Sequence, residues 1–122
     1  MNLERSVGVG SVLRQIADYD CAHVCLLHQG FNPPAIDQPL TADNIISHLG
    51  ADRCSFQPLF TDNYSFRERG IYYISGPGLG HWVSFLRGMV LDPYDGAVLQ
   101  PDDLIQRYEK YGSITWYVSI VD

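Results

Sequence analysis

The stretch CAHVCLLHQ, residues 21–29, constrains the fold most, because it is apolar on nearly every side of a helix. A helix of this kind has to be surrounded by other elements, so we expect it in the middle of the domain. Gly30 is a suitable C-terminal stop, and Asp20 is a candidate N-cap residue. The pattern therefore places Cys21 in the first turn of a central helix.

The rest of the chain divides into a short helical part and a longer strand-rich part. A helix capped by Thr41 is predicted before Gly50, and residues 51–69 are predicted to form a long loop with one strand near 54–59. Strand, turn and cap patterns predict the remaining elements: a strand at 70–75, a turn at 76–80, a hairpin of 81–86 with 89–92, a helix opened by Pro101 and ended by Gly112, and a final strand at 113–121. Helices first and an antiparallel sheet second indicate one α+β domain over residues 1–122.

The bulk composition excludes several classes of function. A formal net charge of −6, with eight scattered Lys and Arg residues, argues against a nucleic-acid or anionic-membrane surface. No apolar stretch is long enough for a signal peptide or a membrane span. Three cysteines cannot all pair and are too few for a disulfide framework, so we expect a reduced chain. We therefore expect a cytoplasmic protein, or one delivered into a host cell without a signal peptide.

Cys21 is the candidate nucleophile. A thiol attacks as the thiolate, and both a helix N-terminus and a neighbouring imidazolium favour that form. Cys21 has the first feature by its position, although a cysteine in an apolar helix is more often a packing residue. Cys25, one turn deeper in the helix, and Cys54 fit the packing interpretation better.

His81 is the candidate general base among the four histidines. It opens a predicted strand directly after a glycine-rich turn, where a side chain can face a cleft. His23 and His28 lie on the same helix as Cys21, with His23 pointing off its face and His28 about 10 Å further along. His48 belongs to a separate amphipathic helix and has the character of a surface residue.

The predicted hairpin connects His81 with Asp92. If Arg87-Gly88 is a two-residue turn, Val83 pairs with Asp92. Strand side chains alternate, so His81 shares a face with Val83, and Asp92 lies on that face diagonal to His81. Together they match two members of a catalytic triad: the histidine that acts as base and the carboxylate that holds its imidazole in place. The alternative is that Asp92 and Pro93 are present only because both residues favour a turn.

Oxyanion donors and a substrate cleft complete the predicted site. The backbone N–H of Cys21 and the side chain of Gln15 are the candidate donors to the oxyanion. Small residues such as Gly78 and Gly80 let a substrate backbone lie close beside the histidine, and Trp82 is a further candidate contact. An ordinary tight turn explains the same glycines equally well. A phosphate loop is not expected, because the Lys and Ser/Thr are missing and a strand follows.

These residues resemble the papain-like superfamily of cysteine peptidases, in which a glutamine precedes a helix-borne cysteine, and a histidine and an Asp or Asn follow on the sheet. Two spacings are similar to the peptidase domain that processes bacteriocin leaders in ABC exporters: Gln15…Asp20-Cys21 and His81…Asp92-Pro93. That family usually has Gly after the cysteine, where this chain has Ala22, and the interval from His to Asp is short here.

A second resemblance is to the Josephin deubiquitinases. It rests on Cys21-Ala22-x-x-Cys25-Leu26, on His81-Trp82 and on the closing aromatic–apolar strand. That domain is longer, and this chain lacks room for its helical arm. Both resemblances imply a papain-like α+β fold, in which an N-terminal central helix carrying the cysteine packs on a C-terminal antiparallel sheet carrying His and Asp.

The resemblance implies hydrolysis of a peptide or isopeptide bond in a protein or peptide substrate, through a thioacyl-enzyme intermediate and without a cofactor. Two alternatives stay open: glutamine deamidation or amide transfer on the same triad, and a non-catalytic module that binds a peptide in the cleft. A metal site of Cys21, His23, Cys25 and His28 is not expected, because side chains at offsets of two and seven do not converge on a helix.

Overall fold

The computed structural model describes residue 14 and residues 19–59 and 66–121. Three helices lie in this part of the chain: α1 (Cys21–His28), α2 (Ala42–Leu49) and α3 (Pro101–Tyr108). Six strands accompany them: β1 (Cys54–Pro58), β2 (Gly70–Gly76), β3 (Leu79–Leu86), β4 (Met89–Asp92), β5 (Ala97–Leu99) and β6 (Ser113–Ile120). The predicted α+β class is confirmed. Over the described ranges, no helix combines the length and the apolar character that crossing a membrane requires.

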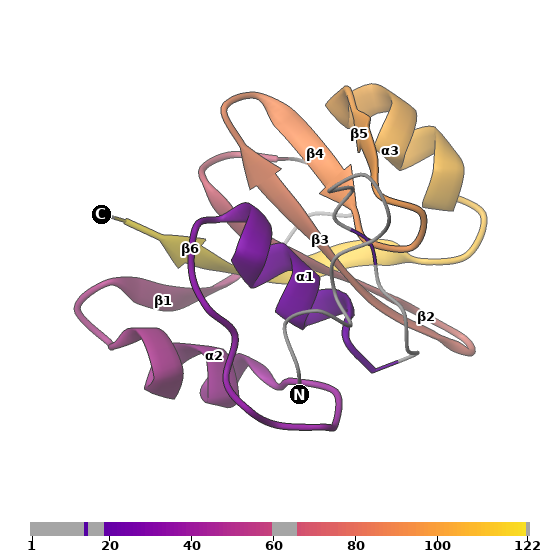
Figure 1. The fold of residues 1–122 in the computed structure, drawn as a ribbon. Helices are drawn as coiled ribbons and strands as arrows, with labels where there is room; N and C mark the ends of the chain where they lie inside the picture. Colours follow the sequence, from indigo (N-terminus) through magenta and orange to yellow (C-terminus); the bar gives the residue numbers. More distant parts are fainter. Residues whose placement is uncertain (1–13, 15–18, 60–65, 122) are drawn as a thin grey trace.

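The six strands form one antiparallel sheet in the order β1-β6-β2-β3-β4-β5 (Figure 1). The predicted two-residue turn between β3 and β4 is confirmed, since Leu86 pairs with Met89 across it. Arg87 and Gly88 both have positive φ angles, of 54° and 80°. A turn with this backbone matches the twist of the strands that it joins, which fixes the register of the hairpin.

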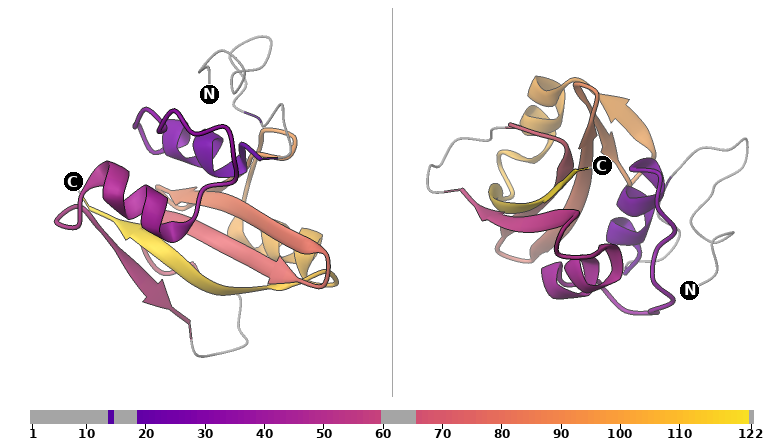
Figure 2. Two further views of the ribbon diagram at one scale, coloured as in Figure 1. Left: turned by 90° about the horizontal axis from the view of Figure 1, so that it is seen from below. Right: turned by 90° about the vertical axis from the view of Figure 1, so that its left-hand side faces the viewer.

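Helices cover both faces of the sheet: α1 and α2 pack on one face and α3 packs on the other (Figure 2). Apolar side chains of the first core include Ala22, Leu26, Ile45, Ile71, Trp82 and Val118. Those of the second core include Tyr72, Ile74, Val83, Val90, Leu104 and Ile114. Successive residues of β3 therefore face opposite cores, as strand geometry requires.

The C-terminal end of α1 is held against the sheet by polar side chains. The Gln29 amide donates to Ser84 Oγ at 2.8 Å, and Arg69 Nε donates to the Gln29 amide oxygen at 2.7 Å. His28 Nδ1 also lies 2.6 Å from Ser84 Oγ. Because α1 is short, fixing this end also fixes its first turn, with Cys21, relative to the strands.

The predicted cap of α2 is confirmed. Thr41 Oγ1 accepts from the Asn44 backbone N–H at 3.1 Å, and the Asn44 side chain accepts from the Thr41 backbone N–H at 3.0 Å. This reciprocal capping box satisfies two backbone donors at the start of the helix.

Two local predictions are wrong, and one strand was not predicted at all. Asp20 is at the N-cap position of α1 and fully buried, but its side chain makes no capping hydrogen bond. β3 begins at Leu79, so the turn shrinks to Pro77-Gly78 and His81 does not open the strand. The sequence also gives no sign of β5, because a strand this short has no alternation to detect and forms by pairing with β4. For β3 and β5, strand pairing outweighs local residue preference.

The contact of Gly70 with β6 makes a prediction about stability. A Cβ at this position would lie 2.3 Å from the carbonyl oxygen of Val118, a backbone atom that cannot move away without breaking the sheet. We expect Gly70→Ala to lower the free energy of unfolding by about 1 to 3 kcal/mol, measured by urea denaturation. Ser75→Ala, in the same strand, is the control and should change it by less than about 0.5 kcal/mol. Equal stability of Gly70→Ala and the unmodified chain would contradict this close approach.

Candidate active site

His81 and Asp92 meet beyond the last residue pair of β3 and β4. That pairing ends at Ser84 and Leu91, after which Asp92 pairs with β5 on the other edge of β4. His81 Nε2 lies 2.7 Å from Asp92 Oδ1, and the two residues are 7% and 0% exposed. The predicted contact is confirmed, whereas the catalytic role of the pair stays a prediction.

The Asp92 carboxylate accepts hydrogen bonds from several further donors. The backbone N–H of Tyr94 donates to Oδ1 at 3.0 Å. Arg107 Nη1 and the Tyr108 hydroxyl, both on α3, donate to Oδ2 at 2.9 and 2.6 Å. Burial raises the pKa of Asp92, but the hydrogen bonds from His81 and Tyr108 outweigh burial and lower this pKa from 3.8 to about 2. The carboxylate is therefore ionised at neutral pH.

Cys21, in the first turn of α1, contacts the same imidazole. Asp92 lies at Nε2, and an interaction with the Cys21 side chain is among the causes that raise the pKa of the same ring. Burial lowers the pKa of His81, but the hydrogen bonds with Asp92 and Cys21 outweigh it and raise this pKa from 6.5 to about 9. The ring is therefore a cation at neutral pH, and an imidazolium beside a cysteine favours nucleophilic sulfur chemistry.

The other cysteines and histidines have structural surroundings. Burial raises the pKa of Cys25 well above its usual value, and burial also raises the pKa of Cys54. His23 Nε2 and His48 Nε2 each bind a backbone carbonyl oxygen at 2.7 Å. Within the part of the chain that the structure describes, no three His, Cys, Asp or Glu side chains are grouped as metal ligands.

A cavity of about 480 Å³ opens beside His81. We call it the histidine cavity. Its other lining residues are Leu79, Tyr94, Asp95, Arg107, Tyr108 and Tyr111. Tyr94 and Tyr111 are 69% and 62% exposed, so the outer walls of the cavity are open to an incoming molecule.

The remaining predicted site residues fall in different places. Gln15 lies outside the described residues. Gly78 is in the turn before β3, with a φ of 74° that favours glycine. A Cβ on Gly80 would lie 2.4 Å from the Tyr73 hydroxyl, so the space beside this glycine is filled by the protein itself. Trp82 points into the core beneath α1 and α2, away from the side of β3 that carries His81.

Sequence reasoning missed Arg107 and Tyr108 as partners of Asp92. The sequence pattern of the helix that Pro101 opens places Tyr108 on its inward face with Leu104 and Ile105 but indicates no polar partner for it, and Arg107 has no signal of its own. The sequence distance from β4 to α3 gives no indication that the end of α3 lies over Asp92.

Comparisons with protein-family models, curated proteins and solved structures found no significant match. The papain-like assignment therefore stays a prediction that rests on the residues and geometry described above.

The His81–Asp92 pair predicts a pH dependence of stability. The pKa of His81 is raised above its unfolded value of 6.5, so the folded state holds this proton more tightly. The stabilisation is complete below about pH 6.5 and is lost as the pH rises through about 9, by as much as ~3 kcal/mol. Urea denaturation between pH 6.5 and 9 measures it, and His81→Gln should remove most of the slope. A slope in this range that is as steep in His81→Gln as in the unmodified chain would contradict the assignment.

Proposed function

We propose that this chain hydrolyses a peptide or isopeptide bond, with Cys21 as nucleophile, His81 as acid and base, and Asp92 orienting the imidazole. One observation carries the proposal: His81 binds Asp92 at 2.7 Å through Nε2, while the same ring hydrogen-bonds Cys21. Cysteine-dependent acyl transfer requires this order of nucleophile, base and orienting group. The fold that we propose is papain-like, with α1 as the central helix.

The proposed reaction has two steps. The Cys21 thiolate attacks the carbonyl carbon, a C–S bond forms, and the C–N bond breaks as the amine takes the proton from His81. A thioester remains on Cys21. His81 then removes a proton from water, and the resulting hydroxide attacks the thioester. The C–S bond breaks, the carboxylic acid is released, and the Cys21 thiolate is regenerated beside the protonated His81. Asp92 stays ionised throughout and keeps the Nε2–H of His81 in place.

The oxyanion of each step needs donors that are already in position. The backbone N–H of Cys21 has no intrahelical acceptor, because it belongs to the first turn of α1. We propose Gln15 as the second donor.

The histidine cavity favours peptide hydrolysis over glutamine deamidation. The leaving amine takes its proton from His81, which lines this cavity, so we propose that the cavity receives the amine side of the substrate. Ammonia needs no such space, whereas an amine that carries a peptide does. We also propose a reducing compartment such as the cytoplasm, because three cysteines cannot all pair within one chain.

Selective alkylation tests the proposed nucleophile. At about pH 6 we expect iodoacetamide to label Cys21 at least about 10-fold faster than Cys25 and Cys54, because only Cys21 contacts a protonated imidazole. His81→Ala should slow labelling of Cys21, whereas His48→Ala, a matched change of an exposed histidine, should not. Mass spectrometry reads each site separately. If Cys21 is not the fastest, and His81→Ala has no effect, the chain is a binding module and not an enzyme.

Substitution of Asp92 tests the proposed orienting role. We expect Asp92→Ala to lower the alkylation rate of Cys21 by about 10-fold or more. Asp92→Asn should lower it less, because an amide oxygen still accepts a hydrogen bond from the imidazole. Asp103→Asn, an exposed carboxylate in the first turn of α3, is the control and should change nothing. Thermal unfolding of each variant identifies those that stay folded, and the rates are compared among these. A folded Asp92→Ala chain that is alkylated as fast as the unmodified chain would contradict the orienting role.

A further inference from the structure

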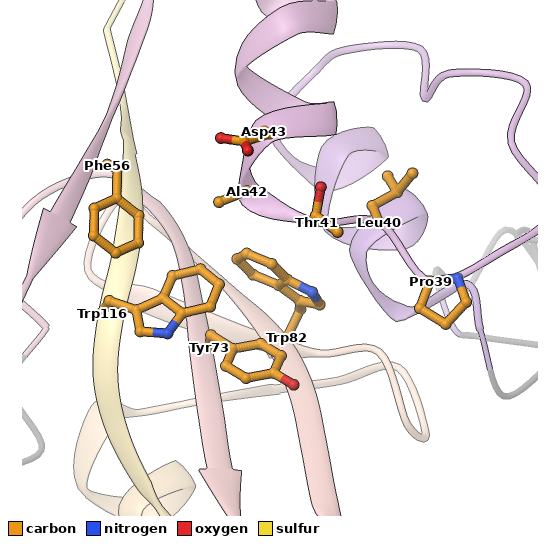
Figure 3. Close-up of a pocket in the computed structure, with 9 residues that line it drawn as sticks. All are labelled: Pro39, Leu40, Thr41, Ala42, Asp43, Phe56, Tyr73, Trp82 and Trp116. Carbon is orange, nitrogen blue, oxygen red and sulfur yellow. The ribbon is translucent and has the colours of Figure 1, made fainter.

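A second cavity, of about 580 Å³, lies on the face of the sheet that carries α1 and α2 (Figure 3). We call it the aromatic pocket. Its lining residues are Pro39, Leu40, Thr41, Ala42, Asp43, Phe56, Tyr73, Trp82 and Trp116. The residues from Pro39 to Asp43 form the helix side of the pocket, and the aromatic residues form its strand side.

The strand side is a continuous wall of four aromatic rings. They come from the neighbouring strands β1, β6, β2 and β3, which carry Phe56, Trp116, Tyr73 and Trp82 in that order. Ring centroids are 5.2 Å apart for Phe56 and Trp116, 4.7 Å for Trp116 and Tyr73, and 5.0 Å for Tyr73 and Trp82. Because the rings pack on one another, the wall is formed before any ligand arrives.

Asp43 is the charged residue of this lining, on the helix side, with Phe56 and Trp116 facing it on the strand side. It is exposed, and it makes no hydrogen bond or ion pair with any residue that the structure describes. Thr41 and Asn44 already cap α2, so the helix does not need this side chain as a cap.

We propose that the aromatic pocket binds the side chain of a basic residue, lysine or its methylated forms, on a protein or peptide. The π faces of Trp, Tyr and Phe attract an organic cation, with Trp the most strongly. A carboxylate opposite such a wall adds charge complementarity, and the apolar lining residues Pro39, Leu40 and Ala42 can contact the aliphatic stem of the lysine.

This inference deepens the proposed function. Trp82 directly follows His81 in β3, so one strand contributes to both sites. If the chain is the peptidase that we propose, the basic residue belongs to the substrate. Binding in the aromatic pocket is nevertheless measurable without Cys21, so the two proposals can fail separately.

The experiment uses intrinsic fluorescence, because both tryptophans of the chain, Trp82 and Trp116, line this pocket. The full chain with Cys21→Ala is titrated with the N-acetyl methylamides of lysine, trimethyl-lysine and norleucine, the last being a neutral analogue of lysine. We expect saturable changes with both cations and binding of norleucine at least about 10-fold weaker.

Two variants locate the binding. Asp43→Asn should weaken binding of both cations by about 2- to 5-fold, as expected for an exposed ion pair, and leave norleucine unchanged. Phe56→Ala, a change at a ring that is 46% exposed, should weaken binding of both cations without unfolding the protein. Asp102→Asn is the matched control, because Asp102 is also an exposed carboxylate in the first turn of a helix but lies outside the pocket.

Three results would overturn the proposal: no saturable change with either cation, norleucine binding as tightly as lysine, or equal affinities of Asp43→Asn and Asp102→Asn for the cations. Slow alkylation of Cys21 together with cation binding would reject the peptidase and keep this pocket. Fast alkylation of Cys21 without cation binding would reject the aromatic pocket as a binding site and keep the proposed peptidase.

Discussion

The buried carboxylate of Asp92 is the interaction that holds the proposed site together. A fully buried charge costs several kcal/mol unless donors surround it, and here they come from β3, the turn after β4, and α3. These contacts hold α3 over the end of β4 and hold His81 across the point where β3 and β4 separate. The imidazole that they hold also interacts with the Cys21 side chain. The same carboxylate therefore holds α3 against the sheet and orients the candidate catalytic histidine.

A second constraint is the alternation of side chains along β3. His81 and Trp82 are neighbours in sequence but point to opposite faces of the sheet, the first toward Asp92 and the second into the aromatic pocket. The polar contacts of Gln29 and His28 with Ser84 join α1 to the same strand. The position of β3 therefore determines the placement of the thiol, the imidazole and the aromatic wall together.

Much of this arrangement was accessible from local sequence signals. The apolar run at 21–29 predicts α1, and the Thr41 cap predicts the start of α2. Arg87-Gly88 predicts a two-residue turn. Because the turn has an even number of residues, the side chains of His81 and Asp92 lie on one face of the hairpin. These inferences succeed because helix caps, apolar periodicity and tight turns are decided by residues within a few positions of one another.

The sequence by itself therefore determined the helices, the strands other than β5, the two-residue turn between β3 and β4, and the contact of His81 with Asp92. Only the tertiary structure decided that Arg107 and Tyr108 lie on the carboxylate, that Cys21 reaches the imidazole, and that Gly80 makes room for Tyr73. It also decided that four distant aromatic residues form one wall opposite Asp43. The physical reason is that these contacts join elements far apart in the chain, and their geometry depends on how helices pack on a twisted sheet, which local residue preferences do not specify.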